Sequence, residues 1–395
     1  AKELQKAIAK SNDFDFFTQG AASAGVYMTN MSGTLASKNF QMAGGFEDID
    51  NFNPEKVAAT YFHGNVHCFG CPIGCGKTAK IDEGPYAGVH GHWPEYETLG
   101  GFGGNCQCDD VEAIAYMNDL CNRYGMDTIS TSSSLAFAME AYEKGLITQD
   151  DTGGLDLTWG NAQAMAEAIH AIARREGIGL LLADGVRAAA ARIGPEAETF
   201  AIHVKGMEVP YHDPRAFLSM AANYATASRG ACHLESLSYW LGYGTRFEGW
   251  YNPEKYDHHD SGGKGTVAAD FQNYMAVYNP LGLCKFIAKG KVEPQHVANL
   301  VNSALGWDWD TGDVLQAGER LVNLKRLINL RLGITAADDT LPQRFLNEPR
   351  PSGGAEGVLP DLDMILEDYY SARKWTADGV PTPERLSELG LDISA

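Results

Sequence analysis

The chain has 395 residues, 44% of them hydrophobic and 21% charged, and its formal net charge is −20. This composition excludes a disordered protein, and the length suggests two domains of ordinary size. The acidic charge argues against a nucleic-acid partner, because such a surface would repel phosphates. The sequence has no apolar run as long as a membrane span, and we expect no signal peptide.

The amino-terminal residues and the cysteines bear on the setting in which the protein works. Residues 1–4 have the character of a helix interior, so we expect the functional unit to begin earlier. The eight cysteines have no regular pair spacing, which suggests a reducing compartment. We therefore predict a cytoplasmic protein, from an anaerobe if its metal chemistry is accessible to solvent.

Most of the sequence has helical periodicity. In chain order, helices are predicted over 109–124, 130–144, 161–175, 179–193, 311–332, 359–375 and 382–389. On the longest, one stripe is interpreted as core and consists of Val314, Leu321, Leu324 and Ile328. Strand signals are few and lie around 199–204, whereas 247–265 and 349–357 are predicted loops. We therefore predict an all-α, multihelical fold with one helical domain over 1–203 and another over 204–395.

The run over 67–77 places Cys68, Cys71 and Cys75 in a C-x2-C-x3-C spacing, with glycine and proline between them. Thiolates that share one small metal cluster must converge, and glycine allows the tight turns that this requires. The spacing predicts three ligands of a 4Fe–4S cluster, with a fourth ligand elsewhere. Zinc is an alternative, although no second C-x2-C pair is present. Three buried, unreactive thiols are the remaining alternative.

The fourth cluster ligand has several candidates in the sequence. Cys284 lies two residues after Gly282 and precedes Lys285, which gives it a modest advantage. Cys121 and Cys232 lie in helical or near-helical patterns, where cysteine is usually a small buried hydrophobic residue. The competing cysteines are Cys106, Cys108, Cys121 and Cys232.

Two short segments share the pattern N-x-x-G-[ML]-x, at 122–127 and at 279–284, and we call them the paired motifs. Each follows a helical stretch. A glycine turn with an amide or carboxylate side chain can hold the edge of a planar heterocycle, because these groups accept from ring N–H donors. The alternative is a helix C-cap at Gly125 and Gly282, and the residues alone favour that alternative.

Candidate acid–base residues lie near aromatic and glycine-rich segments. Glu95 and Glu97 precede a glycine run and are candidates for proton transfer, but acidic residues also favour the first turn of a helix. His233 is a further candidate, although a lone histidine is more often structural. The residues alone favour a helix first turn for the glutamates and a structural role for His233.

Taken together, these segments resemble the aldehyde ferredoxin oxidoreductase family of tungsten-pterin enzymes over nearly the whole chain. The matching stretches include the cysteine run, PEYETL at 94–99, LCNRYGMDTIS at 120–130, KGMEVP at 205–210, RGACHL at 229–234, GLC at 282–284 and DDTLP at 338–342. The resemblance covers the two all-α domains of the family. It implies that a β-rich N-terminal domain, which completes the pterin site, is absent from this chain or is supplied by a partner subunit.

The resemblance also implies a cofactor set. A 4Fe–4S cluster would be held by Cys68, Cys71, Cys75 and Cys284, at the junction of the two helical domains. A tungsten or molybdenum bis-pterin would use the paired motifs, with one pterin on each. The implied contact residues are Asn122, Gly125, Met126, Asp127, Asn279, Gly282, Leu283 and Cys284. Family members often carry aspartate where this chain has Asn122 and Asn279, so the charge of that contact is lost here.

For catalysis, the resemblance implies an acid–base pair of Glu97 and His233 near the metal. Glu97 would take a proton from water or the aldehyde hydrate, and His233 would hydrogen-bond the carbonyl oxygen. The implied activity is oxidation of aldehydes to carboxylic acids, with electrons leaving through the cluster to ferredoxin or an iron–sulfur electron-transfer subunit. We expect an oligomer.

The substrate class has an alternative within the same fold, which is reduction of benzoyl-CoA or a related aryl-CoA by a multi-subunit enzyme. Two departures from the aldehyde pattern favour it: the histidine-bearing insert at 88–93 and the aromatic loop at 239–259. Ordinary loop divergence explains them equally well. A second alternative is a non-catalytic electron-transfer subunit that keeps the cluster and lacks the pterin.

Overall fold

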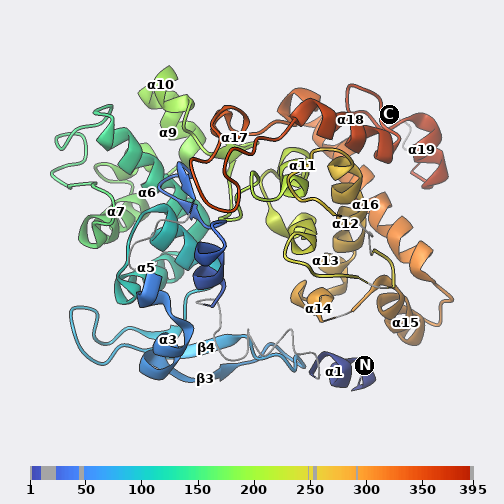
Figure 1. The fold of residues 1–395 in the computed structure, drawn as a ribbon, viewed down its shortest axis with the longest axis horizontal. Coiled ribbons are helices and arrows are strands. Elements are labelled where there is room, and N and C mark those ends of the chain that lie inside the picture. Colours follow the sequence, from blue (N-terminus) through green and yellow to red (C-terminus); the bar gives the residue numbers. More distant parts are fainter. Residues whose placement is uncertain are drawn as a thin grey trace. The chain divides into compact units, whose positions relative to one another are not determined.

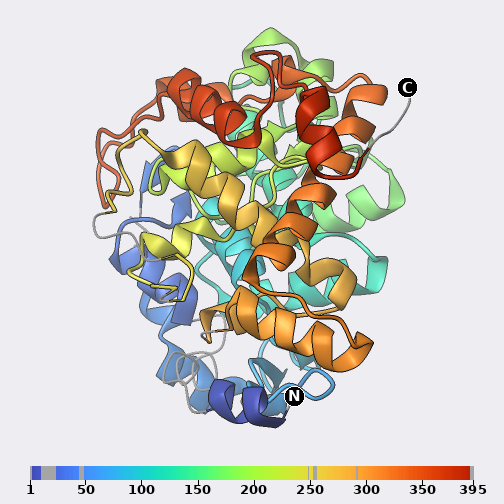
Figure 2. The ribbon, with the colours of Figure 1, turned by 90° about the vertical axis from the view of Figure 1, so that its right-hand side faces the viewer.

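A computed structural model describes residues 2–9, 24–43, 49–247, 249–251, 256–290 and 292–391. The chain forms two compact units, and each is described by itself. The hairpin unit consists of residues 14–213 and 342–358, and the long-helix unit consists of residues 1–13, 214–341 and 359–395. Helices dominate the described residues, and the strands are few and short (Figure 1; Figure 2). The predicted all-α class is confirmed.

The compact units differ from the predicted ranges 1–203 and 204–395 in two ways. The chain leaves the hairpin unit between Asp213 and Pro214, and the segment 342–358 returns to it. A buried ion pair fixes this return, because Arg344 Nη2 lies 2.7 Å from Glu140 Oε1 and neither side chain is more than 4% exposed. The predicted ranges stay a prediction of how the family's domains divide.

The hairpin unit begins with a helix over 24–31 and two small strands that pair antiparallel, and a three-stranded sheet follows. Its early elements are β1 Ala36–Ser37, β2 Met42–Ala43, η2 Ile49–Phe52, α3 Pro54–Tyr61, β3 Phe62–Val66, β4 Gly76–Lys80, β5 His90–His92, α4 Tyr96–Thr98 and η3 Leu99–Asn105. Its later elements are α5 Val111–Tyr124, α6 Thr128–Glu143, α7 Ala162–Arg174, α8 Gly179–Leu182, α9 Val186–Ile193, α10 Pro195–Glu198, β6 His203–Val204, β7 Met207–Glu208 and α17 Gln343–Asn347.

The long-helix unit contains α1 Lys2–Ala9, α11 Leu218–Thr226, η4 His233–Glu235, η5 Ser238–Leu241, α12 Lys264–Ala276, α13 Tyr278–Leu281, α14 Phe286–Lys289, α15 Pro294–Leu305, α16 Thr311–Arg331, η6 Ala336–Asp338, α18 Leu362–Arg373 and α19 Pro383–Glu388. α12 packs against α16 and α18. In the part of the chain that is described, none of these helices combines the length and the hydropathy of a membrane span.

Local signals set the ends of the predicted helices. The carboxylate of Asp110 caps α5 by accepting from the N–H groups of Glu112 and Ala113, as N-cap aspartates do. The predicted helices at 130–144, 161–175, 311–332, 359–375 and 382–389 are confirmed as α6, α7, α16, α18 and α19, with shifts of a few residues at their ends. Residues 349–357 form turns and bends, as predicted for a loop.

The single helix predicted over 179–193 is wrong, because the segment forms two helices, α8 and α9. The break lies at Gly185, whose φ of +84° belongs to the left-handed region. The Glu208 side chain comes close there and accepts a hydrogen bond of 2.8 Å from the Val186 N–H at the start of α9. A Cβ at Gly185 would stand 2.6 Å from Glu208 Oε1, so the interruption depends on a distant residue.

The apolar stripe predicted as core on the helix 311–332 is only partly buried. Val314 is buried, but Leu324 and Ile328 are 36% and 49% exposed. The buried face of α16 is instead largely polar and comprises Gly318, Glu319, Asn323, Arg326 and Asn329. Partners from other segments of the chain satisfy these groups. Arg326 pairs with Asp339 at 2.9 Å, and Asn323 accepts from the Trp375 indole N–H at 2.8 Å.

Candidate functional site

The three cysteines of the run lie on the loop that joins β3 to β4. These strands pair antiparallel, with Val66 opposite Gly76, so residues 67–75 form the loop of a hairpin. Gly70 and Gly74 both have positive φ, which lets the loop turn tightly. None of the eight cysteines, all of which are described, forms a disulfide. The spacing therefore produces the compact, partly exposed thiol loop that a cluster requires.

Two side chains contact the backbone of this cysteine loop. His67 Nδ1 lies 3.1 Å from the carbonyl oxygen of Cys71. Lys77 Nζ donates to the carbonyl of Gly74 at 3.2 Å and to Asn65 Oδ1 at 2.8 Å. Burial lowers the pKa of Lys77, and the neighbouring Cys75 acts in the opposite direction. The loop is thus held from its base by charged or polar groups.

Burial separates the candidates for the fourth ligand, because only a thiolate binds a cluster well. Burial raises the pKa of both Cys108 and Cys121 to about 12, and raises that of Cys106 well above its ordinary value. Cys232 is also buried, and Arg229 donates to its sulfur at 2.7 Å. Cys284 is exposed, which fits a ligand. Cys284 belongs to the long-helix unit, so its convergence with the hairpin loop stays a prediction.

The paired motifs have the same backbone geometry. At the first, the N–H of Gly125 donates to Asn122 O at 3.3 Å and that of Met126 to Cys121 O at 2.9 Å. At the second, the N–H of Gly282 donates to Asn279 O at 3.1 Å, and the corresponding bond from Leu283 to Tyr278 O is 3.0 Å. Both are Schellman C-caps with a left-handed glycine. The helix-cap alternative is therefore correct as a description of the backbone.

This capping role leaves the outer side of each turn open. A Cβ at Gly125 or Gly282 would meet no described atom within 4 Å. The side chains of Asn122 and Asn279 are exposed. Asp127 is already engaged, since its carboxylate accepts from the Ser130 N–H at 2.8 Å and caps α6. Both turns are thus available to a ligand, but what they bind stays a prediction.

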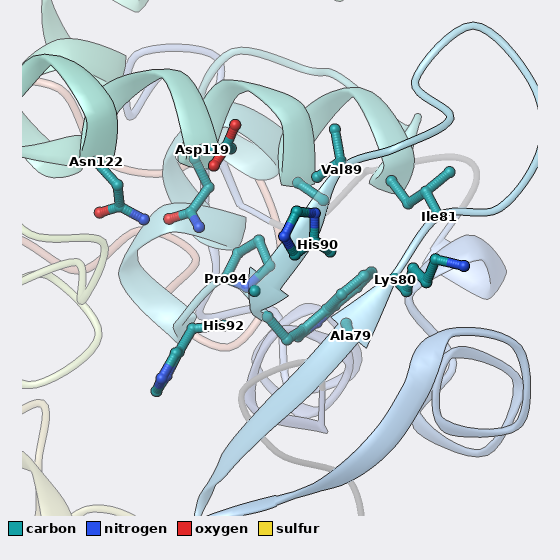
Figure 3. A pocket seen from close by; sticks show the side chains of 13 residues that line it. Ala79, Lys80, Ile81, Val89, His90, His92, Pro94, Asp119 and Asn122 are labelled. Atoms are coloured by element: carbon teal, nitrogen blue, oxygen red, sulfur yellow. The ribbon is translucent and has the colours of Figure 1, made fainter.

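A small, solvent-open pocket lies beside the first motif (Figure 3). Figure 3 shows Asp119 and Asn122 on α5 and the two histidines His90 and His92 on the adjacent strand β5. The insert at 88–93 therefore lines a pocket together with the first residue of the motif. Asn118 also lines it and is 9% exposed.

Glu97 is held by the segment around Tyr211. Its Oε2 accepts a hydrogen bond of 2.8 Å from the Tyr211 N–H, and its Oε1 lies 3.2 Å from His212 Nε2. The ring of His212 stacks on Tyr96 with centroids 4.7 Å apart. Tyr96 in turn donates its hydroxyl to the Tyr211 carbonyl at 3.0 Å. Tyr96 and Tyr211 thus hold the Glu97 carboxylate beside the His212 imidazole.

The core of the hairpin unit fixes this arrangement through Tyr211. Its hydroxyl is fully buried, donates to Ile129 O at 3.0 Å, and lies 2.6 Å from the Ser132 hydroxyl. Burial raises the pKa of Tyr211 well above its ordinary value, so the phenol stays neutral and can donate. The glycine run contributes close packing, because a Cβ at Gly101 would stand 2.5 Å from the Tyr211 ring.

Sequence reasoning missed His212 as a partner of Glu97. The signal that could have found it is its place two residues after the KGMEVP match at 205–210, in a segment with neighbouring proline residues. His233, the predicted partner of Glu97, lies at the start of η4 in the long-helix unit. Since the two residues belong to different units, their pairing stays a prediction.

The comparisons with known proteins agree with this description of the chain. The family model for aldehyde ferredoxin oxidoreductase, domains 2 and 3, matches residues 1–391. The chain is 39% identical over 373 residues to the tungsten-containing aldehyde ferredoxin oxidoreductase of Thermococcus kodakarensis and, over 375 residues, to that of Pyrococcus abyssi. Each match covers 93% of this chain and 59% of the relative. The chain therefore spans less than two thirds of these curated relatives.

A more distant relative and a solved structure extend the comparison. The chain is 30% identical over 338 residues to the WOR-like subunit of the aliphatic sulfonate oxidoreductase of Pyrococcus furiosus, covering 82% of this chain and 50% of that one. The fold is similar to the active-site complex of benzoyl-coenzyme A reductase with 1,5-dienoyl-CoA, with a TM-score of 0.72 at 20% identity, over 93% of this chain and 59% of that one. By its family match and its 39% identity to the tungsten enzymes, the chain belongs to the aldehyde ferredoxin oxidoreductase family, a family of oxidoreductases.

Proposed function

We propose that the chain forms the two helical domains of a tungsten-bis-pterin oxidoreductase that oxidises aldehydes to carboxylic acids. The observation that carries the proposal is the Glu97 carboxylate, oriented by the Tyr211 N–H and adjacent to His212. A positioned carboxylate that can exchange a proton is what hydration and oxidation of an aldehyde require. The 39% identity to tungsten-containing aldehyde ferredoxin oxidoreductases supports the same reaction class.

In this proposal the cofactors are held by the predicted residues. Cys68, Cys71, Cys75 and Cys284 hold one 4Fe–4S cluster, and the paired motifs hold one pterin each. The accessible thiols and the open turns fit these groups. The metal, when bound, supplies Lewis-acid and redox chemistry. Tungsten is favoured because the relatives named above contain it.

The chain's own residues handle the proton. Glu97 accepts a proton from water or the aldehyde hydrate, and its Oε2 stays oriented by the Tyr211 N–H. His212 is a positioning residue, because its Nε2 lies 3.2 Å from the second carboxylate oxygen of Glu97. His233 donates to the carbonyl oxygen of the substrate.

The proposal requires partners beyond this chain. The curated relatives are longer, and we propose that a β-rich N-terminal domain or subunit completes the pterin site. Electrons leave through the cluster to ferredoxin or an iron–sulfur subunit. We further propose an oligomeric cytoplasmic enzyme that binds no nucleic acid, in keeping with a net charge of −20.

Aryl-CoA reduction is a second candidate function. It is favoured by His90 and His92, which line the pocket beside Asn122 and provide groups that can donate protons in a reductive reaction. The structural similarity to benzoyl-coenzyme A reductase, at 20% identity, supports the fold and not this activity. A third candidate, an electron-transfer subunit without pterin, predicts iron and labile sulfide but no tungsten or molybdenum.

The test begins with the natively purified protein and all its partners. Aldehyde oxidation predicts about one tungsten atom and about four iron atoms per catalytic unit, together with dye reduction by benzaldehyde. Incubation with a cyclic dienoyl-CoA and the same viologen dye tests the second candidate. Dye reduction by the dienoyl-CoA but not by the aldehyde would overturn the proposal. Iron without tungsten or molybdenum would leave only the electron-transfer subunit.

A further inference from the structure

Lys77 is a buried lysine at the base of the cysteine loop. Lys77 is only 3% exposed to solvent, and lysine is seldom buried to this extent. Lys80, on the same strand β4, shows the ordinary situation. Its side chain is 51% exposed and pairs at the surface with Asp82. The burial of Lys77 therefore calls for a compensating interaction.

The contacts of Lys77 join three parts of the hairpin. Lys77 on β4 stands opposite Asn65 on β3 in the sheet register, and its Nζ donates to the Asn65 side chain at 2.8 Å. The same Nζ donates at 3.2 Å to the carbonyl of Gly74, a left-handed residue directly before Cys75. The carbonyl of Lys77 accepts from the Trp93 N–H at 2.9 Å, which joins the third strand. One side chain thus connects both strands to the interior of the loop.

The position of this ammonium has an electrostatic consequence. Lys77 Nζ donates to the carbonyl of Gly74, the residue directly before Cys75, so its ammonium group lies beside the cysteine loop. A 4Fe–4S cluster with four thiolate ligands is negative and becomes more negative on reduction. Its potential depends on nearby charge, hydrogen bonds and exposure to solvent. In a buried environment a cation is poorly screened, so its effect on such a group is large.

We propose that Lys77 is a positioning residue of the cluster, which holds the cysteine loop in shape and whose buried positive charge raises the cluster's reduction potential. The proposal rests on the proposed function, because it assumes that the loop holds a cluster. Lys77 favours the reduced state because that state carries the additional negative charge. A merely structural role would hold the loop but would leave the potential unchanged.

The test uses the natively assembled enzyme with all its partners and three variants. Lys77→Arg keeps the charge, Lys77→Gln keeps a neutral donor, and Lys80→Met is the matched surface control on the same strand. Iron and labile sulfide are measured first, and then the cluster is titrated with dithionite and followed by its electron paramagnetic resonance signal. We expect a more negative potential in Lys77→Gln than in the wild type and in Lys77→Arg, with no shift in Lys80→Met.

Three outcomes are informative. Equal potentials in Lys77→Gln, Lys77→Arg and the wild type, at full iron content, would overturn the proposal. If Lys77→Gln binds no cluster, Lys77→Met, a fourth variant that is also uncharged, is titrated in its place. A more negative potential in Lys77→Met than in Lys77→Arg supports the proposal, and equal potentials overturn it. Absence of iron and sulfide from the wild type would instead refute the proposed function.

Discussion

Replacing Glu97 by glutamine separates the proton chemistry of this residue from its packing. Glutamine has nearly the same shape, and its side-chain oxygen can still accept from the Tyr211 N–H that now bonds Oε2 at 2.8 Å. The amide nitrogen then takes the place of Oε1, beside His212. If the amide turned the other way, the loss would be one hydrogen bond, or about 1 kcal/mol of stability. The fold should therefore survive the change.

The loss of activity should be larger than this loss of stability. A positioned general base contributes roughly 10²–10⁴-fold to the rate, which corresponds to about 3–5 kcal/mol of transition-state stabilisation. Glutamine cannot accept the proton, so kcat should fall by that factor while the tungsten and iron contents stay at the wild-type level. The assay is oxidation of benzaldehyde with a viologen dye, with metal content measured on each preparation.

The matched control is Glu83→Gln, a carboxylate in the same unit. Glu83 is exposed, so its replacement should change turnover by no more than about twofold. If Glu97→Gln with full tungsten kept turnover within about threefold of the wild type, its role as the base would be wrong.

Two further substitutions and one labelling experiment test other parts of the structure. His212→Phe removes the imidazole that lies 3.2 Å from Glu97 Oε1, so kcat for benzaldehyde should fall while the tungsten and iron contents stay at the wild-type level; an unchanged kcat would contradict the positioning role. Arg344→Met removes the hydrogen bonds of 2.8 and 2.7 Å that Arg344 donates to the buried Glu140, and the more exposed Lys144, 3.8 Å away, compensates that carboxylate only weakly. The free energy of unfolding, followed by tryptophan fluorescence, should fall by about 3–5 kcal/mol. Because burial raises the pKa of Cys121 to about 12, its thiol should resist iodoacetamide at pH 8 in the native protein and react after unfolding, as mass spectrometry can show.

Local sequence signals were enough to predict α5, α6, α7, α16, α18 and α19, whereas α11 and α15 were not predicted. The Asp110 cap and the left-handed Gly125 at the ends of α5 involve neighbouring residues only, so their effect does not depend on the rest of the fold. The cysteine run is similar, because glycine conformation and ligand spacing are local properties. The short strands β3, β4 and β5 were not predicted, since a strand is stabilised by a partner that is distant in sequence.

The candidate site shows the same division. The sequence and its resemblance to a family singled out the cysteine loop, the paired motifs and Glu97, because each has a recognisable local pattern. Only the tertiary structure placed His212 beside Glu97, broke the helix at Gly185 and turned polar residues of α16 inward. Each of these depends on a contact with a remote segment, and neither periodicity nor residue spacing contains that information.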